Sequence, residues 1–329
     1  MTGARVHVVA LGARTPLGLS AESAAAALRA GISRLEEQSF LIGPAHDLLT
    51  GAHDPMLSDH VPYLERLETM TLDALAQVLR KLVSTEGTLP RVHIALALPE
   101  ARPGFGDTDA RQVLAGLAQR TAHWGFEHVW ERVGQGHAGG CVGLARARQG
   151  AQDACTLWLV GGVDSYYAPA TLQALLQSRR LATPSVRGGF PPGEGAGFVA
   201  LASERLMRTW RLTSLGVLRG AHTAQEPARV LLGEVSRAQG LSEAVLGACA
   251  ELHLPEQAPE LLLSDINGER HRAEEWGLVQ LRLGAQLLAH TYETPGSYWA
   301  DVGAASVPLF VVLACRSFAR EQPPQRALL

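Results

Sequence analysis

The sequence predicts an α/β protein whose strands are joined by crossover helices. Short β-branched apolar runs alternate with segments rich in alanine and leucine that keep helical spacing. A glycine-dense run at 188–197 leads directly into an apolar strand, and glycines there supply close backbone approach and positive φ angles. The chain has 329 residues and 47% hydrophobic content, which is enough to bury a large core.

Strands are predicted where short apolar runs are bounded by turn residues. These runs are 6–11, 92–98, 156–161, 197–202, 214–221 and 260–264. Helices are predicted where apolar residues recur every three or four positions. The helix at 21–30 has Ser20 as its N-cap and Gly31 as its C-cap. The other predicted helices are 65–83, 107–122, 140–151, 169–176, 228–237, 269–288 and 304–318.

The segment 201–214 carries three arginines and little apolar periodicity, so we expect the chain to cross there between two halves. The N-terminal half would be 1–207 and the C-terminal half 208–329. No low-complexity linker separates them, and we therefore expect one compact body.

Composition excludes several classes of protein. The net charge of −3 arises from interspersed acids and bases, which argues against a nucleic-acid partner. The apolar run 6–11 is too short for a signal or membrane-spanning segment, so we expect a cytoplasmic protein. The cysteines are scattered without a CxxC pair, and neither a metal site, a disulfide framework nor a cofactor is expected.

Three motifs carry a resemblance to a known family. They are the run Gly-Gly-Phe-Pro-Pro-Gly-Glu-Gly-Ala-Gly at 188–197, the opening run at 8–18, and Asp-Val-Gly-Ala-Ala-Ser at 301–306. Together they make the chain similar to the β-ketoacyl synthases, a branch of the thiolase-like condensing enzymes. The resemblance spans 6–318 and is weak over 41–91 and 227–259. It implies a thiolase-like αβαβα layered fold with two pseudo-repeated halves, in which two mixed sheets sandwich buried helices.

The family's nucleophile is a cysteine at the start of a buried helix, where the helix N-terminus lowers the thiol pKa and stabilises an oxyanion. Aligning His137 and the alanine after it with the family's Thr-Ala pair puts Gly139 at that position. Cys141 lies two residues further on, and two helical positions turn a side chain by about 200°. Cys141 is therefore either a displaced nucleophile, with His137 as a candidate base, or a buried packing thiol.

The resemblance puts Asn267 and Ala300 at the positions of the family's two catalytic histidines, and Pro295 where a lysine is usual. An asparagine can donate a hydrogen bond to a thioester carbonyl but cannot shuttle protons. Asn267 is equally interpreted as part of a tight Asn-Gly turn that caps the next helix.

Other family positions are retained. Phe190 stands at the position of the family's gating phenylalanine, while Gly193, Gly195 and Gly303 keep its two glycine-rich turns, and all four are candidate substrate-binding positions. Arg270, with the nearby arginine at 272, is a candidate for binding an anionic group such as a phosphopantetheine phosphate.

Because the thiol, both histidines and the lysine are replaced, the resemblance implies a non-catalytic partner or acyl-chain-binding subunit in a fatty-acid-like or polyketide-like pathway. Relatives of this kind pair with an active ketosynthase, and 128–133 fits the strand through which the family forms dimers. A homodimer, a heterodimer and a contact with acyl-carrier protein all follow as expected partners. The alternative is an active acyltransferase, thioesterase or 3-oxoacyl-ACP synthase-like enzyme that uses Cys141, or a cleft chemistry built from Asp265, Asn267 and Glu269. A protein with a filled cleft that serves interaction alone is a third hypothesis.

Overall fold

The computed structural model describes residues 5–42, 48–83, 90–151, 155–228, 230–287 and 291–329. Its main feature is a six-stranded mixed sheet in the order β5-β4-β6-β7-β1-β8. The strands are β1 (Val6–Arg14), β4 (Arg91–Leu98), β5 (His128–Gln135), β6 (Thr156–Ser165), β7 (Glu194–Ser203) and β8 (Gly216–Leu218). β4 runs parallel to both β5 and β6, whereas β7 is antiparallel to β6 and β1.

A second sheet is smaller and, within the described residues, wholly parallel. Its order is β10-β9-β11, from Thr291–Glu293, Leu261–Leu263 and Ala327–Leu328. The expectation of two mixed sheets is therefore wrong for this half, where each strand is only two or three residues long. A separate hairpin joins β2 (Glu36–Ile42) and β3 (Leu48–Gly51).

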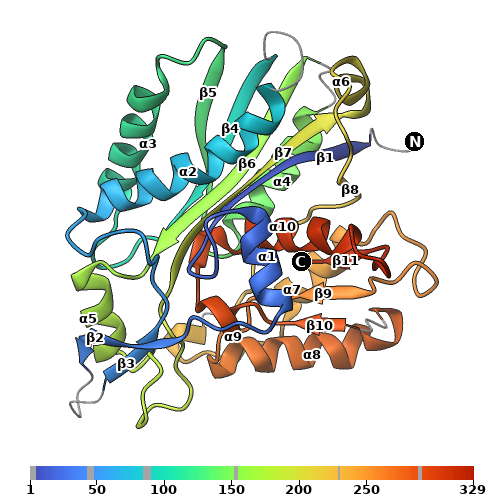
Figure 1. Ribbon diagram of the computed structural model, residues 1–329. Helices are drawn as coiled ribbons and strands as arrows, with labels where there is room; N and C mark the ends of the chain where they lie inside the picture. The colour runs from blue at the N-terminus through green and yellow to red at the C-terminus, as the bar shows by residue number, and fades with distance from the viewer. Residues whose placement is uncertain (1–4, 43–47, 84–89, 152–154, 229, 288–290) are drawn as a thin grey trace.

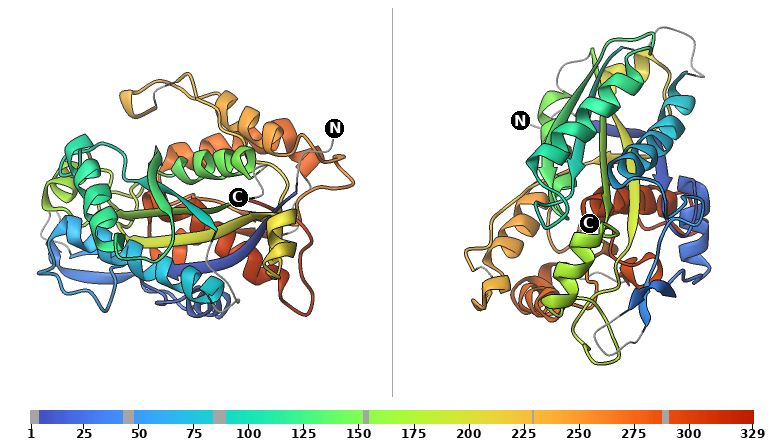
Figure 2. Two further views of the ribbon diagram at one scale, coloured as in Figure 1. Left: turned by 90° about the horizontal axis from the view of Figure 1, so that it is seen from above. Right: turned by 90° about the vertical axis from the view of Figure 1, so that its left-hand side faces the viewer.

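Helices and sheets alternate in five layers, which confirms the predicted αβαβα architecture (Figures 1 and 2). On the outer face of the large sheet lie α2 (Tyr63–Val83) and α3 (Asp107–Thr121). Between the sheets lie α1 (Ala21–Arg29), α4 (Gly139–Gly150) and α10 (Ser306–Phe318), and beyond the small sheet lie α7 (Gln239–Ala248) and α8 (Arg270–Leu287). Shorter helices are α5 (Pro169–Gln177), α6 (Glu204–Thr209) and α9 (Gly296–Trp299).

The middle layer unites the molecule because its apolar side chains contact both sheets. One core cluster contains Leu201 of the large sheet, Leu309 and Phe310 of α10, and Leu261 of the small sheet. Burying such side chains supplies about 25 cal/mol for each Å² of apolar surface removed from water. The core therefore fixes how the loops at the sheet ends meet.

Two local predictions were wrong. The helix expected at 228–237 is replaced, within the described residues, by a short 3-10 turn at Val230–Leu232, and Gly233 leaves it with φ +86°. Leu231 and Leu232 of this turn are exposed and none of its residues is buried, so no amphipathic face is buried to stabilise a helix there. The strand expected at 214–221 shortens to β8, which pairs with β1; the division of the chain at 207 stays a prediction.

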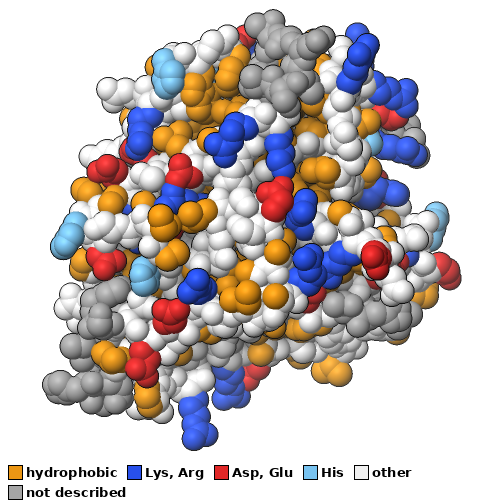
Figure 3. Space-filling view, viewed as in Figure 1, with side chains coloured by type: hydrophobic (Ala, Val, Ile, Leu, Met, Phe, Trp, Pro, Cys, Tyr) orange, Lys and Arg blue, Asp and Glu red, His pale blue; other side chains and the backbone are white. Residues whose placement is uncertain are grey.

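No helix in the described ranges is long and apolar enough to cross a membrane. On the face seen in Figure 3, basic side chains gather toward the side of α6 and β8, with acidic side chains scattered among them.

Candidate functional site

Three loops meet at Asp301, a side chain only 4% exposed. The turn after β5 contributes His137, whose Nε2 lies 2.8 Å from Asp301 Oδ1 and 3.0 Å from Oδ2. The loop after β9 contributes Asn267, whose amide donates to Asp301 Oδ2 at 2.5 Å. Ala300 directly precedes Asp301, and Gly139 lies two residues after His137 at the start of α4. The structure thus brings together the loops that carry all three degenerate positions.

The Asp301 carboxylate is held ionised by its neighbours. Burial raises the pKa of Asp301, but His137, Arg272 and the amide of Asn267 together lower it by more. The net shift of its pKa is therefore downward. The backbone N–H of Gly303 also donates to Oδ1 at 2.8 Å. Asp301 is therefore a structural hub, and its oxygens are occupied by protein donors.

Arg272 is partly buried within the same network. It contacts Asp265, lies 3.5 Å from Glu269 Oε2, and approaches His137 Nδ1 at 3.2 Å. Glu269 in turn accepts two hydrogen bonds from Arg180, at 2.7 and 3.1 Å. These internal acidic partners neutralise the Arg272 guanidinium, which argues against its binding an external anion.

Arg270, the candidate anion-binding residue, lies outside this network. Its side chain is 85% exposed and pairs with Glu274 at 2.5 Å on the surface of α8. An exposed pair at this spacing contributes only a few tenths of a kcal/mol, about 0.3–0.5.

His137 bridges the two halves of the molecule. Burial and Arg272 lower the pKa of its imidazole, yet Asp301 raises it more, and the net shift is upward. With Nε2 on a carboxylate and Nδ1 facing a guanidinium, the neutral tautomer fits when Nε2 carries the proton. The sequence left open whether His137 is a catalytic base or a polar cap. In the structure both of its ring nitrogens contact protein groups.

Gly139, which the sequence aligns with the family's nucleophile, is closely packed against Ala97 and Gly134. A Cβ added at Gly139 would lie 2.8 Å from the Cβ of Ala97 and 3.1 Å from the carbonyl carbon of Gly134. Real Cβ atoms essentially never approach to 2.8 Å, and 3.1 Å is a tight contact, so a side chain at Gly139 would force α4 to shift from β4 and β5.

Cys141 is partly buried in the first turn of α4 and packs against the main core. Burial, with a smaller contribution from Asp265, raises the pKa of its thiol to about 11. A thiol with such a pKa is almost entirely protonated at neutral pH, and the thiolate is the reactive form.

Ala300 adopts φ +66° and ψ −170°, a region used almost only by glycine. A Cβ at Gly193 would meet the Cβ of Ala300 and the carbonyl oxygen of Trp299, each at 2.9 Å. Gly303 has φ +48°, and a Cβ there would lie 2.1 Å from the Asp164 carboxylate. These glycines therefore serve backbone packing around the site.

No family model and no curated protein matches the sequence. Solved structures do. A type II polyketide acyl-carrier protein in complex with its ketosynthase (AntDE:AntF) superposes with a TM-score of 0.72 at 15% identity, covering 98% of this chain and 90% of that one. The ishigamide ketosynthase/chain length factor gives 0.76 at 14% identity, covering 98% and 88%. A β-ketoacyl synthase from Burkholderia phymatum gives 0.71 at 14%, covering 99% and 89%.

The chain has the ketosynthase fold. Within that fold, Phe190 is 1% exposed and packs in a cluster with Tyr166, the two rings lying 5.1 Å apart. The Arg180 guanidinium lies 5.6 Å from the Phe190 ring, so this side chain is held in place. Gly195 lies on β7, where an added Cβ would be 3.0 Å from the Arg14 carbonyl oxygen.

Sequence reasoning missed the buried polar groups that hold the ketosynthase-fold loops in position. Glu194, in the glycine-rich run, accepts hydrogen bonds from Arg66 at 2.7 Å through each oxygen. Asp164 accepts from Arg102 at 2.5 Å and from the Ala304 N–H at 3.0 Å. The acidic residue inside a glycine-rich, apolar strand could have indicated that Glu194 has a buried basic partner, because buried carboxylates require partners.

Neither of the two described surface pockets lies at this site. In the described part of the chain, no group of three or more His, Cys, Asp or Glu side chains is arranged to hold a metal ion. The arrangement can hold three loops together by charge and hydrogen bonding, and it offers no activated nucleophile.

Proposed function

We propose that the chain is a cytoplasmic, ketosynthase-fold subunit that lacks condensing activity and partners an active ketosynthase in a polyketide-like or fatty-acid-like pathway. The observation that carries the proposal is the nucleophile position. Gly139 has no room for a side chain, and the polar side chains around it are already hydrogen-bonded or ion-paired with one another. Covalent acyl transfer requires a thiolate together with a positioned partner, and this arrangement supplies neither.

The second support is the exposed edge of β5. This strand ends the large sheet, and within the described residues its outer edge has no partner strand. Val129 on this strand is 40% exposed. An unpaired edge carrying apolar residues is a template for another strand, so we propose that β5 pairs with a second ketosynthase-fold chain, either identical or catalytically complete. The proposal is in keeping with two similar structures, a ketosynthase/chain length factor and a ketosynthase in complex with its acyl-carrier protein. Acyl-carrier protein is accordingly the second proposed partner.

Co-expression tests the proposal. The chain is produced with a tagged ketosynthase from the same organism that retains the cysteine and two histidines, and the complex is isolated by the tag. We expect a stoichiometric heterodimer whose acyl-chain elongation on carrier protein depends on the ketosynthase cysteine. A homodimer would confirm that the chain assembles through its own copies but would not support the partner role with an active ketosynthase. If the ketosynthase elongates chains equally well without this subunit and never binds it, the partner role is wrong.

An active enzyme using Cys141 is the competing hypothesis, and the raised thiol pKa weighs against it. Its test is alkylation with iodoacetamide at pH 7, compared with the exposed Cys155 as an internal reference. We expect Cys141 to react more slowly than Cys155. Faster reaction at Cys141 would instead favour the enzyme.

A further inference from the structure

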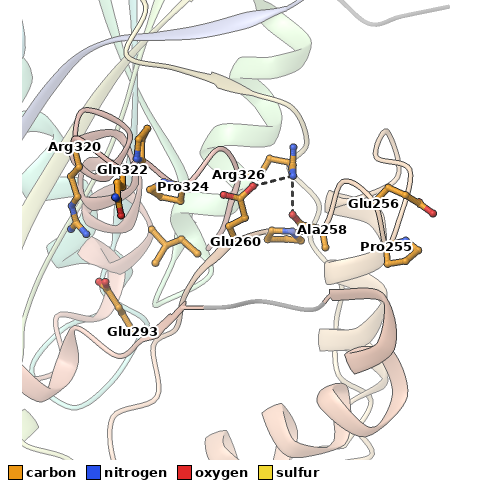
Figure 4. A pocket seen from close by; sticks show the side chains of 12 residues that line it. Pro255, Glu256, Ala258, Glu260, Glu293, Arg320, Gln322, Pro324 and Arg326 are labelled. Atoms are coloured by element: carbon orange, nitrogen blue, oxygen red, sulfur yellow. Dashed lines mark hydrogen bonds and ion pairs between the residues drawn. The ribbon is translucent and has the colours of Figure 1, made fainter.

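A surface pocket of about 470 Å³ lies between the small sheet and the C-terminal segment, and none of its lining residues belongs to the Asp301 network. Leu261 of β9 and four prolines, among them Pro324, line its walls (Figure 4). In the middle of the pocket, Arg326 donates to Glu260 at 3.0 Å and to the Ala258 carbonyl oxygen at 3.0 Å. The polar groups of this middle part are therefore hydrogen-bonded to one another.

One end carries polar groups that have no partner among the residues the structure describes. Arg320 follows α10, and its Nε is shielded from solvent without a hydrogen-bond partner in the described ranges. Glu293 ends β10, and Gln322 lies on the C-terminal segment; neither side chain forms an ion pair or hydrogen bond with another described residue. Figure 4 shows Arg320, Gln322 and Glu293 at the same end of the pocket, away from the Glu260–Arg326 pair.

A buried donor without a partner costs stability, and a ligand that accepts from it recovers that cost. Arg320 offers a guanidinium suited to a carboxylate, and Glu293 offers a carboxylate suited to an ammonium group. Beside them, the proline and leucine wall offers an apolar surface, and small-molecule sites combine such walls with a few polar groups. A ligand bearing both charges and a short apolar side chain complements all three features.

We propose that this pocket binds a free α-amino acid with an apolar side chain, its carboxylate on Arg320 and its ammonium group on Glu293. The proposal does not rest on the partner role of the degenerate site. The purified full-length chain would therefore bind the ligand whether or not a ketosynthase is present.

Isothermal titration calorimetry with L-leucine tests the proposal. We expect binding in the range of about 0.01–1 mM. N-acetyl-L-leucine, which lacks the ammonium group, and L-leucinamide, which lacks the carboxylate, should each bind at least about tenfold more weakly. Equal binding of either analogue would overturn the assignment, as would no heat with leucine, phenylalanine or proline up to about 10 mM.

Three variants locate the site. Arg320→Met and Glu293→Gln should each weaken leucine binding by about tenfold or more, while Glu256→Gln, at the far rim, should change it less than about twofold. Thermal melts check that each variant is folded. If a variant does not fold, the titrations of the unmodified chain with the two leucine analogues test the proposal instead. Unchanged binding in Arg320→Met would overturn the proposal.

Discussion

At the scale of single residues, Gly139 and Ala300, which align with family catalytic positions, differ from those positions in the space around them as well as in side chain. Gly139 lacks a thiol and also lacks the space for one, since Ala97 and Gly134 occupy it. Ala300 lacks an imidazole and sits in a backbone conformation that disfavours any side chain. At both positions the surrounding structure therefore disfavours a larger side chain.

Gly139→Ala should destabilise the protein by about 1–3 kcal/mol, because the new Cβ overpacks the contact with Ala97. Urea unfolding measures the change. Gly277→Ala is the matched control, since Gly277 is an exposed helical glycine with nothing within 4 Å of an added Cβ. The control should gain up to about 1 kcal/mol from helix propensity. Equal stabilisation of both variants would show that the space at Gly139 is open.

Ala300→Gly should stabilise the protein by about 1 kcal/mol. Relief of a strained backbone is worth about 1–3 kcal/mol, and removal of the buried methyl group costs about 0.8 kcal/mol. Ala304→Gly, at a buried position without a positive φ, serves as control and should lose stability. Chemical denaturation of both variants checks the prediction, which fails if Ala300→Gly loses as much as the control.

Restoring the family's residues should not restore condensation. The triple variant Gly139→Cys, Asn267→His and Ala300→His would place side chains in a crowded turn, a hydrogen-bonded loop and a strained position. A misplacement of about 1 Å can cost about 100-fold in rate. Radiolabelled malonyl incorporation measures the outcome, and turnover near that of an intact ketosynthase would contradict this account of the site.

At the scale of elements, sequence patterns predicted most strands and helices well. α1, α2, α3 and α8 match their predictions closely, because capping residues and apolar spacing are local signals. The helix predicted at 228–237 does not form in the described residues because its apolar residues have no core to pack against.

The contacts at Asp301 join loops that are far apart in the chain. His137 and Arg272 could therefore be named as candidates from the sequence, but their pairing could not be predicted.

The loops that meet at Asp301 should give the protein a characteristic pH dependence. The pKa of His137 is raised, so its pairing stabilises the fold below about pH 6.5 and is lost as pH rises through the raised value. The pKa of Asp301 is lowered, so its contribution is present above about pH 4 and lost in stronger acid. Stability should therefore peak between about pH 4 and 6.5.

Urea unfolding between pH 5 and 9 measures this dependence, with His137→Gln as the variant that removes the titration. In that variant the decline in stability above about pH 6.5 should flatten. His222→Gln is the control, because His222 is a largely exposed histidine distant from Asp301 in the chain, and its profile should match the unmodified protein. A wild-type profile that rises steadily toward pH 9 would contradict the assigned direction.

At the scale of the whole molecule, the five layers leave two edges on the large sheet, β5 and β8. Val129 on β5 and Val217 on β8 are equally exposed, at 40% each, which makes them a matched pair. Val129→Lys should weaken the proposed dimer, since a lysine on an edge opposes strand pairing, and Val217→Lys should leave it intact. Light scattering at micromolar concentration measures both. A monomeric wild-type protein, or equal effects of the two substitutions, would contradict assembly through β5.

The central claim is that this ketosynthase-fold chain carries no acyl group on itself, and intact-mass spectrometry tests it most directly. The purified protein is incubated with acyl-CoA and with acyl-carrier protein, beside Cys141→Ser and an active ketosynthase as positive control. The account predicts an unchanged mass for both forms of this chain and a clear adduct on the control enzyme. An acyl adduct on the wild-type chain that disappears in Cys141→Ser would contradict it.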